Sequence, residues 1–461
     1  MNTRLEQDSI GTKEVPETAY YGIHTVRAVE NFPITGVSLS HFPDLVRALA
    51  MVKLAAARAN TELGALDAER AKWIGSACRD LIAGKKHDAF VVDMIQGGAG
   101  TSTNMNANEV IANLAAEKAG RPLGGYDYIH PNDHVNRSQS TNDVYPTAIR
   151  LAVLFKCHRL IEEQRLLLAA FSAKAEAFSD IRKVGRTQLQ DAVPMTVGRE
   201  FASFAAALTE EITRLEDLSK VLRVVNLGGT AIGTGINTPA GYAEVAVRHL
   251  SAISGQDLRC ARDLVDASSN MGALVSFSGL LRRVAIKISK ICNDLRLLNS
   301  GPRAGIGEIV LPAVQAGSSI MPGKVNPVIP EVVSQVAYQV IGNDVTITMA
   351  AEAGQLQLNA MEPVIAYNLL ESMRMLENAM KTLRVRCVDG IQADRERCED
   401  LFASSLVLAT ALVPELGYET SAKVAKEAQA SHRSIKSVVV EAGLMTSAAF
   451  QDTIEKSFEH L

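Results

Sequence analysis

Hydrophobic and polar residues follow a helical spacing along four long stretches that contain no glycine or proline: residues 147–184, 199–227, 280–300 and 364–389. In the first stretch, hydrophobic residues recur three or four positions apart, as in Ala148, Leu151, Ala152 and Phe155. That period is typical of an amphipathic helix. If this stretch is fully helical, it is about 57 Å long at ~1.5 Å per residue. The pattern therefore predicts an elongated bundle of long helices.

A further helix is expected to begin at Pro330, because proline and an acidic residue such as Glu331 both favour the first turn of a helix. Its later part, residues 345–348, consists of β-branched residues whose propensity alone would favour a strand. We predict helix there as well, since the segments on both sides have helical patterns.

The two ends of the chain differ from this central region. Residues 1–140 mix Gly, Pro and Asn clusters with short helical stretches, and the residues after Gln392 have the pattern of a small helical cap. We expect a mainly all-α fold with three parts. They are an N-terminal mixed, mainly helical domain (1–140), a central long-helix bundle (141–392) and a small C-terminal helical domain (393–461). A chain of 461 residues is long enough for such a division.

Composition narrows the possible functions. The chain has 47% hydrophobic and 21% charged residues, which is ordinary for a globular protein. Its net charge of −4 gives no reason to expect a nucleic-acid or membrane surface, and no hydrophobic run approaches the ~20 residues that span a bilayer. Residues 1–8 are unlike a signal peptide. The six cysteines are dispersed, so we expect reduced thiols in a cytoplasmic protein, and no polar cluster supports the alternative of a catalytic thiol.

One segment combines two hydroxyls, an ammonium group and an amide within eleven residues: Gly317-Ser318-Ser319-Ile320-Met321-Pro322-Gly323-Lys324-Val325-Asn326-Pro327. Its glycines permit unusual backbone angles and its prolines prevent a helix. The combination predicts a loop that opens and closes over a small anionic ligand. An ordinary turn between helices is the simpler alternative, but such a turn does not need these side chains together.

Three more polar clusters lie at residues 96–109, 130–143 and 185–194. The first is rich in glycine and leads into an apolar helix, whose exposed N–H groups could face an anion. The second precedes the long helix expected from Thr147, and the third is expected between two long helices. Helix capping by Ser, Thr and Asn is the alternative, but it explains only one or two residues of each cluster.

Two patterns suggest cofactor binding only weakly. His130 and His134 have the spacing of some zinc-binding helices, but Pro131 opposes a continuous helix and no third ligand is evident. The glycine-rich segment 228–235 lacks the Gly-Lys-Ser/Thr ending of a phosphate-binding loop and the last glycine of a dinucleotide fingerprint. We interpret it as a loop between helices and expect neither a metal nor an organic cofactor.

These motifs resemble the signature segments of the fumarase/aspartase superfamily, and the resemblance covers essentially the whole chain. Residues 98–108 are similar to the first signature, residues 138–143 to the second, and the loop 317–327 to the third. Members of this superfamily remove an amine or a hydroxyl from a succinyl-type substrate and release fumarate. The stretch 20–25 (Tyr-Tyr-Gly-Ile-His-Thr) and Gln188 are more similar to the ammonia-lyase branch than to class II fumarases, which have Trp-Gly-Ala-Gln-Thr and His at these places.

The resemblance implies elimination of ammonia from L-aspartate through an enediolate, with Ser318 as the base that removes the Cβ proton as an oxyanion. Lys324 and N–H groups around Gly317 are expected to lower the pKa of that hydroxyl. The resemblance also assigns substrate contacts by the group that they hold: Thr101, Ser140, Thr141 and Ser319 for the β-carboxylate; Thr187, Lys324 and Asn326 for the α-carboxylate; Asn142 and Gln188 for the amino group.

The superfamily forms homotetramers in which three subunits contribute to each active site, and the same assembly is expected here. Fumarases pair an acid corresponding to Glu331 with a histidine in place of Gln188. Since glutamine cannot shuttle a proton, we do not expect that relay, and the group that protonates ammonia stays open.

Other functions compatible with the sequence are a class II fumarase, an argininosuccinate or adenylosuccinate lyase, and a helical structural protein without catalysis. Anion binding without turnover is a further alternative, although it gives no need for Ser318.

Overall fold

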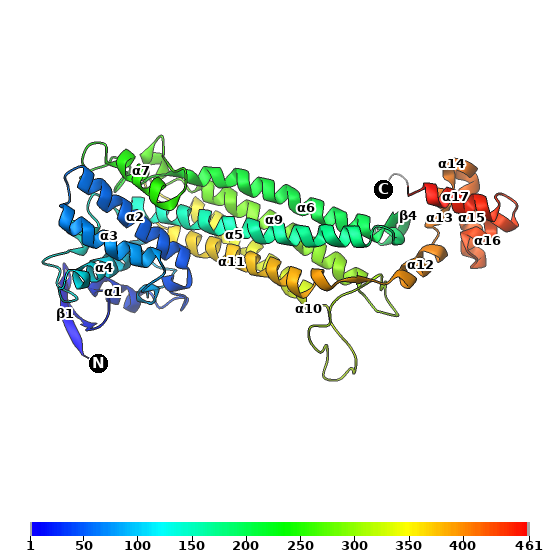
Figure 1. Cartoon of the computed structure of the whole chain (residues 1–461), viewed down its shortest axis with the longest axis horizontal. Helices are drawn as coiled ribbons and strands as arrows, with labels where there is room; N and C mark the ends of the chain where they lie inside the picture. The colour runs from blue at the N-terminus through cyan, green and yellow to red at the C-terminus, as the bar shows by residue number, and fades with distance from the viewer. Residues whose placement is uncertain (1, 459–461) are drawn as a thin grey trace. The chain divides into compact units, whose positions relative to one another are not determined.

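The computed structural model describes residues 2–458, and helices dominate it (Figure 1). The chain divides into two compact units. Unit 1 comprises Met1–Ile161, Arg214–Arg283 and Gln339–Met375, and unit 2 comprises Glu162–Thr213, Val284–Tyr338 and Leu376–Leu461. The expectation of a mainly all-α fold is confirmed, whereas the division at residues 140 and 392 stays a prediction.

Unit 1 begins with an antiparallel hairpin of β1 (Thr3–Asp8) and β2 (Gly11–Pro16). Most of the unit is made of helices: α1 (Ile23–Asn31), α2 (Pro43–Glu62), α3 (Ala68–Ile82), α4 (Thr101–Lys118), α7 (Tyr242–Ser254) and α8 (Leu264–Ala267). Helix α2 packs against α3, α4 and α7 (Figure 1). Most of its side chains are buried. With 20 and 18 residues, α2 and α4 are longer than the short helices that the sequence indicates for this region.

Shorter elements complete unit 1. They are the 3-10 turns η1 (Leu39–His41), η2 (His87–Ala89) and η4 (Lys220–Arg223), the π-helical turn η3 (Pro131–Val135), and the parallel pair β5 (Val224–Val225) and β6 (Arg259–Cys260).

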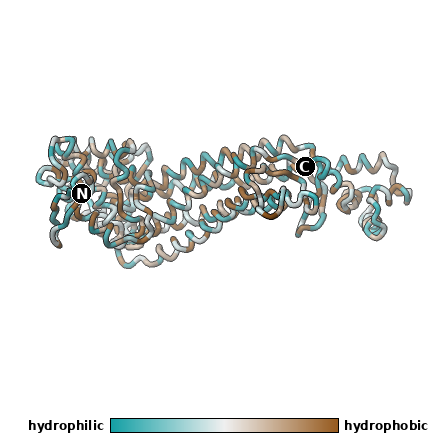
Figure 2. Tube along the Cα trace, turned by 90° about the horizontal axis from the view of Figure 1, so that it is seen from below, coloured by the Kyte–Doolittle hydropathy of each residue, from teal (hydrophilic) through white to brown (hydrophobic). Residues whose placement is uncertain are grey.

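The five longest helices each contribute residues to both units: α5 (Thr141–Ala177), α6 (Val197–Ser219), α9 (Gly272–Leu298), α10 (Val328–Glu352) and α11 (Glu362–Arg386). Hydrophilic and hydrophobic residues alternate along the helices (Figure 2). Helix α10 begins two residues before Pro330, and residues 345–348 are helical, as expected. No helix within residues 2–458 combines the length and the hydrophobicity needed to cross a bilayer.

Helix α5 corrects the expected range of 147–184 at both ends. It begins at Thr141 and contains Pro146, which has no N–H to donate to the carbonyl oxygen of Asn142. The side-chain Nδ2 of Asn226 donates to that oxygen instead, at 2.9 Å, so the helix tolerates proline. At its other end α5 stops at Ala177, because the chain continues into a strand.

That strand belongs to a hairpin in unit 2 that the sequence analysis missed. Strand β3 (Arg182–Thr187) pairs antiparallel with β4 (Gln190–Thr196), and a second small pair joins β7 (Ile309–Val310) to β8 (Gln392–Ala393). After the turn η5 (Val388–Gly390), short helices follow: α12 (Arg395–Ser404), α13 (Val407–Ala411), α14 (Val413–Leu416), α15 (Tyr418–Ser431), α16 (Ile435–Glu441) and α17 (Ser447–Lys456). They share a hydrophobic core that includes Leu412, Val439 and Phe450.

A buried ion cluster holds the hairpin within unit 2. The fully buried carboxylate of Glu308 pairs with Lys183 Nζ and with Arg186 Nη1, each at 2.8 Å. Lys183 is itself only 3% exposed and also pairs with Glu200 of α6. The cluster therefore ties β3 to α6 and to the segment that leads into β7.

We expect Glu308→Gln to destabilise the protein by about 3 kcal/mol, because it leaves the buried charge of Lys183 with less compensation. The matched control is Asp217→Asn, which breaks the exposed pair between Lys220 and Asp217 and should change stability little. Differential scanning calorimetry measures the thermal unfolding midpoint of both variants. Equal midpoints for the two variants would show that the Glu308 cluster does not stabilise unit 2.

Candidate active site

The ten residues expected at the site fall into two groups. Unit 1 contains Thr101, Ser140, Thr141 and Asn142, and unit 2 contains Thr187, Gln188, Ser318, Ser319, Lys324 and Asn326.

Thr101 is the first residue of α4 and is exposed. The preceding residue, Gly100, has a φ of +89°, and the ring of Tyr145 lies where a β-carbon of Gly100 would be, with its Cδ1 only 2.3 Å away. The Thr101 hydroxyl donates to the carbonyl oxygen of Gly98 at 2.8 Å. Glycine at 100 therefore lets the start of α4 lie directly against α5.

The buried asparagines of α4 have structural partners. Asn106 accepts a hydrogen bond from the Val91 N–H and donates to the carbonyl oxygen of Ala89. Asn113 accepts from the Gly124 N–H and donates to the carbonyl oxygen of Tyr20. The first polar cluster thus exposes Thr101 to solvent, while Asn106 in the same cluster and Asn113 beyond it connect loops to the helix.

The buried carboxylate of Glu109 positions the start of α1. It accepts from the N–H groups of Gly22 and His24, each at 2.8 Å, and from the Thr25 hydroxyl at 2.6 Å. The motif at residues 20–25 is therefore connected to the helix that begins at Thr101.

A buried lysine that sequence reasoning missed links α4 to the segment before α5. Lys53 of α2 is fully buried and donates to Asn104 Oδ1 at 2.7 Å, Asn136 Oδ1 at 2.8 Å and Gln139 Oε1 at 3.0 Å. Asn104 Nδ2 in turn donates to the Thr141 hydroxyl at 3.2 Å. Burial lowers the pKa of Lys53 to about 7, and the charge of Asp143 opposes that change. A single lysine within the apolar run 48–57 was the available signal, since lysine is seldom fully buried.

Asp143 holds the glycine-rich segment 228–235 against the start of α5. Its Oδ1 accepts from the Ser140 N–H at 3.0 Å, and its Oδ2 accepts from the N–H groups of Gly228 and Thr230 at 2.9 and 3.0 Å. Burial raises the pKa of Asp143 to about 6, against the opposing effect of these donors. Asn142 Nδ2 donates to the carbonyl oxygen of Ala231 at 2.8 Å. The segment is a loop, as expected, and it supports Ser140, Thr141 and Asn142.

Thr187 and Gln188 lie at the turn of the β3–β4 hairpin, and both are exposed. The turn consists of Gln188 and Leu189, with φ of +53° and +63°. The cluster lies between the long helices α5 and α6, as expected, and it forms a hairpin whose two-residue turn presents Thr187 and Gln188 to solvent.

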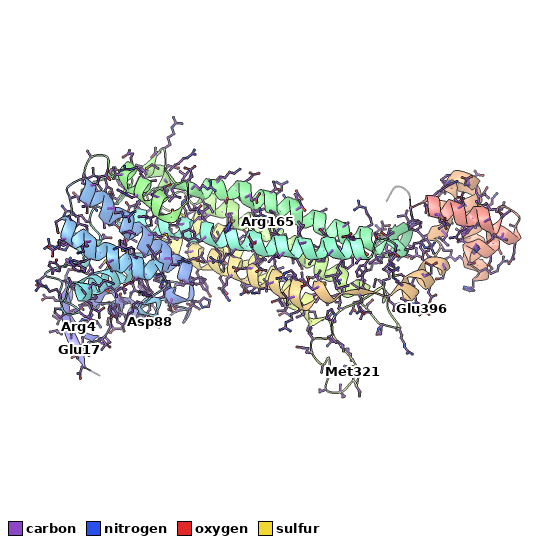
Figure 3. All side chains as sticks on the ribbon, viewed as in Figure 1. Arg4, Glu17, Asp88, Arg165, Met321 and Glu396 are labelled. Atoms are coloured by element: carbon purple, nitrogen blue, oxygen red, sulfur yellow. The ribbon has the colours of Figure 1, made fainter. Side chains whose placement is uncertain are left out.

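The loop 317–327 is closed at its base by two hydrogen bonds. The Gly317 N–H donates to the carbonyl oxygen of Lys324 at 2.9 Å, and Asn326 Nδ2 donates to the carbonyl oxygen of Gly317 at 2.8 Å. The loop extends away from α10, with Met321 at its outer end (Figure 3). This arrangement makes it a discrete element that carries the two serines between its base and its tip.

The Ser318 hydroxyl oxygen accepts hydrogen bonds from two backbone N–H groups. The donors are Ile320 and Met321, each at 3.1 Å. The expected donors were N–H groups around Gly317. The N–H of Gly317 itself donates to the carbonyl oxygen of Lys324 instead. Two N–H groups aimed at one oxygen favour its anionic form.

A cavity of about 590 Å³ lies beside this loop in unit 2. Lys324 and Asn326 line it together with Arg296, Ser300, Glu331 and Asp394. Among residues 2–458, no hydrogen bond or ion pair joins Thr187 or Gln188 to the loop 317–327. Unit 2 therefore presents the hairpin turn and the loop as separate clusters.

The His130/His134 pair and two of the buried cysteines have structural surroundings. The Nδ1 atoms of His130 and His134 both accept backbone N–H groups, and no cluster of three metal-ligating side chains occurs in the described part of the chain. Burial raises the pKa of the thiols of Cys78 and Cys398 to about 12, which keeps them protonated.

Two protein families match this chain, one over most of its length and one near its C-terminus. Residues 11–342 match a family described as Lyase, and residues 408–456 match one described as Fumarase C C-terminus. The chain is 58% identical to the aspartate ammonia-lyase of Pseudomonas aeruginosa, covering 98% of this chain and 96% of that one. It is 52% identical to that of Escherichia coli, covering 98% and 95%.

Solved structures give the same fold. A fumarate lyase:delta crystallin from Brucella melitensis superimposes with a TM-score of 0.96 at 58% identity, and the match covers 99% of both chains. The class II fumarase of Schistosoma mansoni superimposes with a TM-score of 0.94 at 34% identity over the whole of both chains.

The contact between Gly100 and Tyr145 predicts that Gly100→Ala destabilises the protein by about 3 kcal/mol, through overpacking added to left-handed backbone strain. Gly84→Ala is the matched control, because Gly84 has a φ of +87° but no atom within 4 Å of a β-carbon. It should cost only about 1 kcal/mol. Thermal unfolding measures both changes. If the two variants lose the same stability, the contact with Tyr145 has no energetic role.

Proposed function

Because the chain belongs to the fumarase/aspartase superfamily, we propose that it catalyses the reversible elimination of ammonia from L-aspartate to give fumarate. The observation that carries this proposal is the identity of 51–58% to aspartate ammonia-lyases over nearly the full chain. Gln188, in place of the histidine typical of fumarases, supports the same branch.

The reaction begins at a weakly acidic C–H bond. Removal of the Cβ proton places a second negative charge on the β-carboxylate, and the resulting enediolate needs donors that are already in place. Hydroxyl groups serve this purpose because they donate hydrogen bonds without carrying a charge. Thr101, Ser140, Thr141 and Ser319 take this role.

Ser318 is the base in this proposal. Its Oγ acts as an oxyanion, takes the Cβ proton, and leaves the electron pair to form the enediolate; the Cα–N bond then breaks and ammonia departs. The N–H groups of Ile320 and Met321, each 3.1 Å from Oγ, support the anionic state. Closure of the loop would exclude water from this oxyanion.

The remaining contacts orient the substrate. Lys324 supplies a positive charge for the α-carboxylate, and Thr187 supplies a hydroxyl. Asn326 uses one N–H on the carbonyl oxygen of Gly317 and has a second N–H for the carboxylate. Asn142 and Gln188 hold the amino group by hydrogen bonds. None of these steps requires a metal or an organic cofactor.

We propose a homotetramer in which each site takes Thr101 and residues 140–142 from one subunit, Thr187 and Gln188 from a second, and the loop 317–327 from a third. The exposure of Thr101, Thr187 and Gln188 supports this arrangement, since it leaves them accessible to another copy of the chain. The dispersed cysteines agree with a cytoplasmic enzyme.

Purified protein should release fumarate, detected by ultraviolet absorbance, from L-aspartate and not from L-malate. Turnover of malate alone would identify a fumarase and remove Gln188 as a marker of the ammonia-lyase branch. If neither substrate gives a signal, the function is that of a bulkier-substrate lyase, an anion-binding protein or an inactive scaffold.

Shared sites predict complementation between inactive variants. Ser318→Ala and Thr141→Ala should each lose activity by roughly 10³-fold, since one lacks the base and the other an enediolate donor. Subunits that are mixed, dissociated and reassembled should regain activity, because some sites then receive both intact residues. Ser404→Ala is the control, because it removes an exposed hydroxyl outside the site and should keep its activity. The absence of recovery in verified mixed tetramers would contradict shared sites.

A further inference from the structure

The turn of the β3–β4 hairpin has a backbone conformation that its own residues do not favour. Gln188 and Leu189 have φ of +53° and +63°, in the left-handed region that glycine, asparagine and aspartate adopt far more readily. Glutamine and leucine are strained there, and such strain persists only where surrounding contacts hold the backbone. The turn that presents Thr187 and Gln188 therefore depends on contacts outside itself.

Strand β4 is irregular just after this turn. Arg186 pairs with Asp191, but the preceding residue of β3, Gly185, pairs with Val193, so Ala192 is an extra residue in β4. A bulge of this kind bends its strand and redirects nearby side chains, and bulges are common beside active sites. The direction in which the turn points is therefore set where Asp191 and Ala192 lie.

The C-terminal helices contact both of these residues. The hydroxyl of Ser405, which follows α12, donates to Asp191 Oδ2. The hydroxyl of Thr410 in α13 donates to the carbonyl oxygen of Ala192 at 3.4 Å. Val184 of β3 is buried and belongs to the hydrophobic core that the C-terminal helices share. The hairpin is thus attached to these helices at the bulge and along the strand before the turn.

Two hydrogen bonds fix the orientation of the Ser405 hydroxyl. Ser405 is only 6% exposed, and its Oγ accepts from the Val407 N–H at 3.1 Å. Its hydrogen is donated to Asp191, which is exposed on the hairpin. A hydrogen bond to a carboxylate is stronger than one between neutral groups. Ser405 therefore restrains Asp191 from within the C-terminal core.

We propose that Ser405 is a positioning residue for the elimination reaction: through Asp191 it holds the β3–β4 turn so that Thr187 and Gln188 meet the substrate. This inference rests on the proposed function, in which these two side chains hold the α-carboxylate and the amino group. Both groups are held before and during the reaction, so a displaced turn weakens substrate binding more than it slows the chemical step. The C-terminal helices thereby take part in substrate affinity.

The test is steady-state kinetics of the assembled full-length protein with L-aspartate. Ser405→Ala removes the donor, and Asp191→Ala removes the acceptor from the exposed side of the contact. Each variant should raise KM about tenfold and change kcat by less than about twofold. The double variant should resemble either single variant, because all three lose the same hydrogen bond. A merely structural role would lower kcat through a smaller folded fraction and leave KM unchanged.

Two variants are matched controls. Ser404→Ala removes the neighbouring hydroxyl, which is exposed and donates within α12 to the carbonyl oxygen of Asp400, so KM should stay at the wild-type value. Asp191→Asn keeps an acceptor oxygen for Ser405 and should also keep a KM close to wild type.

A raised KM in both alanine variants, with both controls close to wild type, would establish the role of Ser405. An unchanged KM in Ser405→Ala, or additive effects in the double variant, would overturn the inference and leave the proposed function intact. An equal rise in Asp191→Asn would show that the charge of Asp191 acts on the substrate directly, which also contradicts it. If Ser405→Ala does not fold, the contrast between Asp191→Ala and Asp191→Asn gives the same decision. If the wild type releases no fumarate from L-aspartate, the proposed function fails, and this inference fails with it.

Discussion

The hydrogen bonds of the buried Lys53 side chain are the interaction on which the starts of α4 and α5 in unit 1 depend. They connect α2 to Asn104 of α4 and to Asn136 and Gln139, which precede α5. A buried cation without partners is costly, so each of these oxygens is constrained to one place. Because Asn104 also donates to Thr141, the hydrogen-bond geometry around Lys53 sets how the starts of α4 and α5 face each other. The hydroxyls proposed to stabilise an enediolate are therefore held by a group that does not contact the substrate.

Features determined by local pattern were predictable from the sequence. The long helices follow from uninterrupted hydrophobic spacing, and even the β-branched run 345–348 is helical within α10. Features determined by distant partners were not. Helix α5 includes Pro146 because Asn226 completes its hydrogen bonding from elsewhere in the chain. The β3–β4 hairpin turns on Gln188 and Leu189, which lack the Asn-Gly or Asp-Gly signal of a two-residue turn.

The same distinction applies to the candidate site. Motif resemblance pointed to Thr101, the segment 140–142 and the loop as candidates, because their residue types suit the chemistry. It did not identify Lys53 or the role of Asp143, since these depend on burial and on contacts with Asn104, Gly228 and Thr230. The donors to Ser318 also differ from expectation, since a loop's internal hydrogen bonds depend on its folded path. Residue types that suit a ligand can be recognised in the sequence, whereas the contacts that position them are seen only in the fold.

The first turn of α5 has a consequence for the order in which the protein folds as it is made. Asn142 needs partners at Asn226 and Ala231, which follow it by 84 and 89 positions. A ribosome adds about 5–20 residues per second, so these partners emerge roughly 4–18 s after Asn142 itself. A helix forms within about a microsecond once its bonds are available. The pace of translation, rather than the speed of helix formation, thus sets when this turn is completed in a newly made chain.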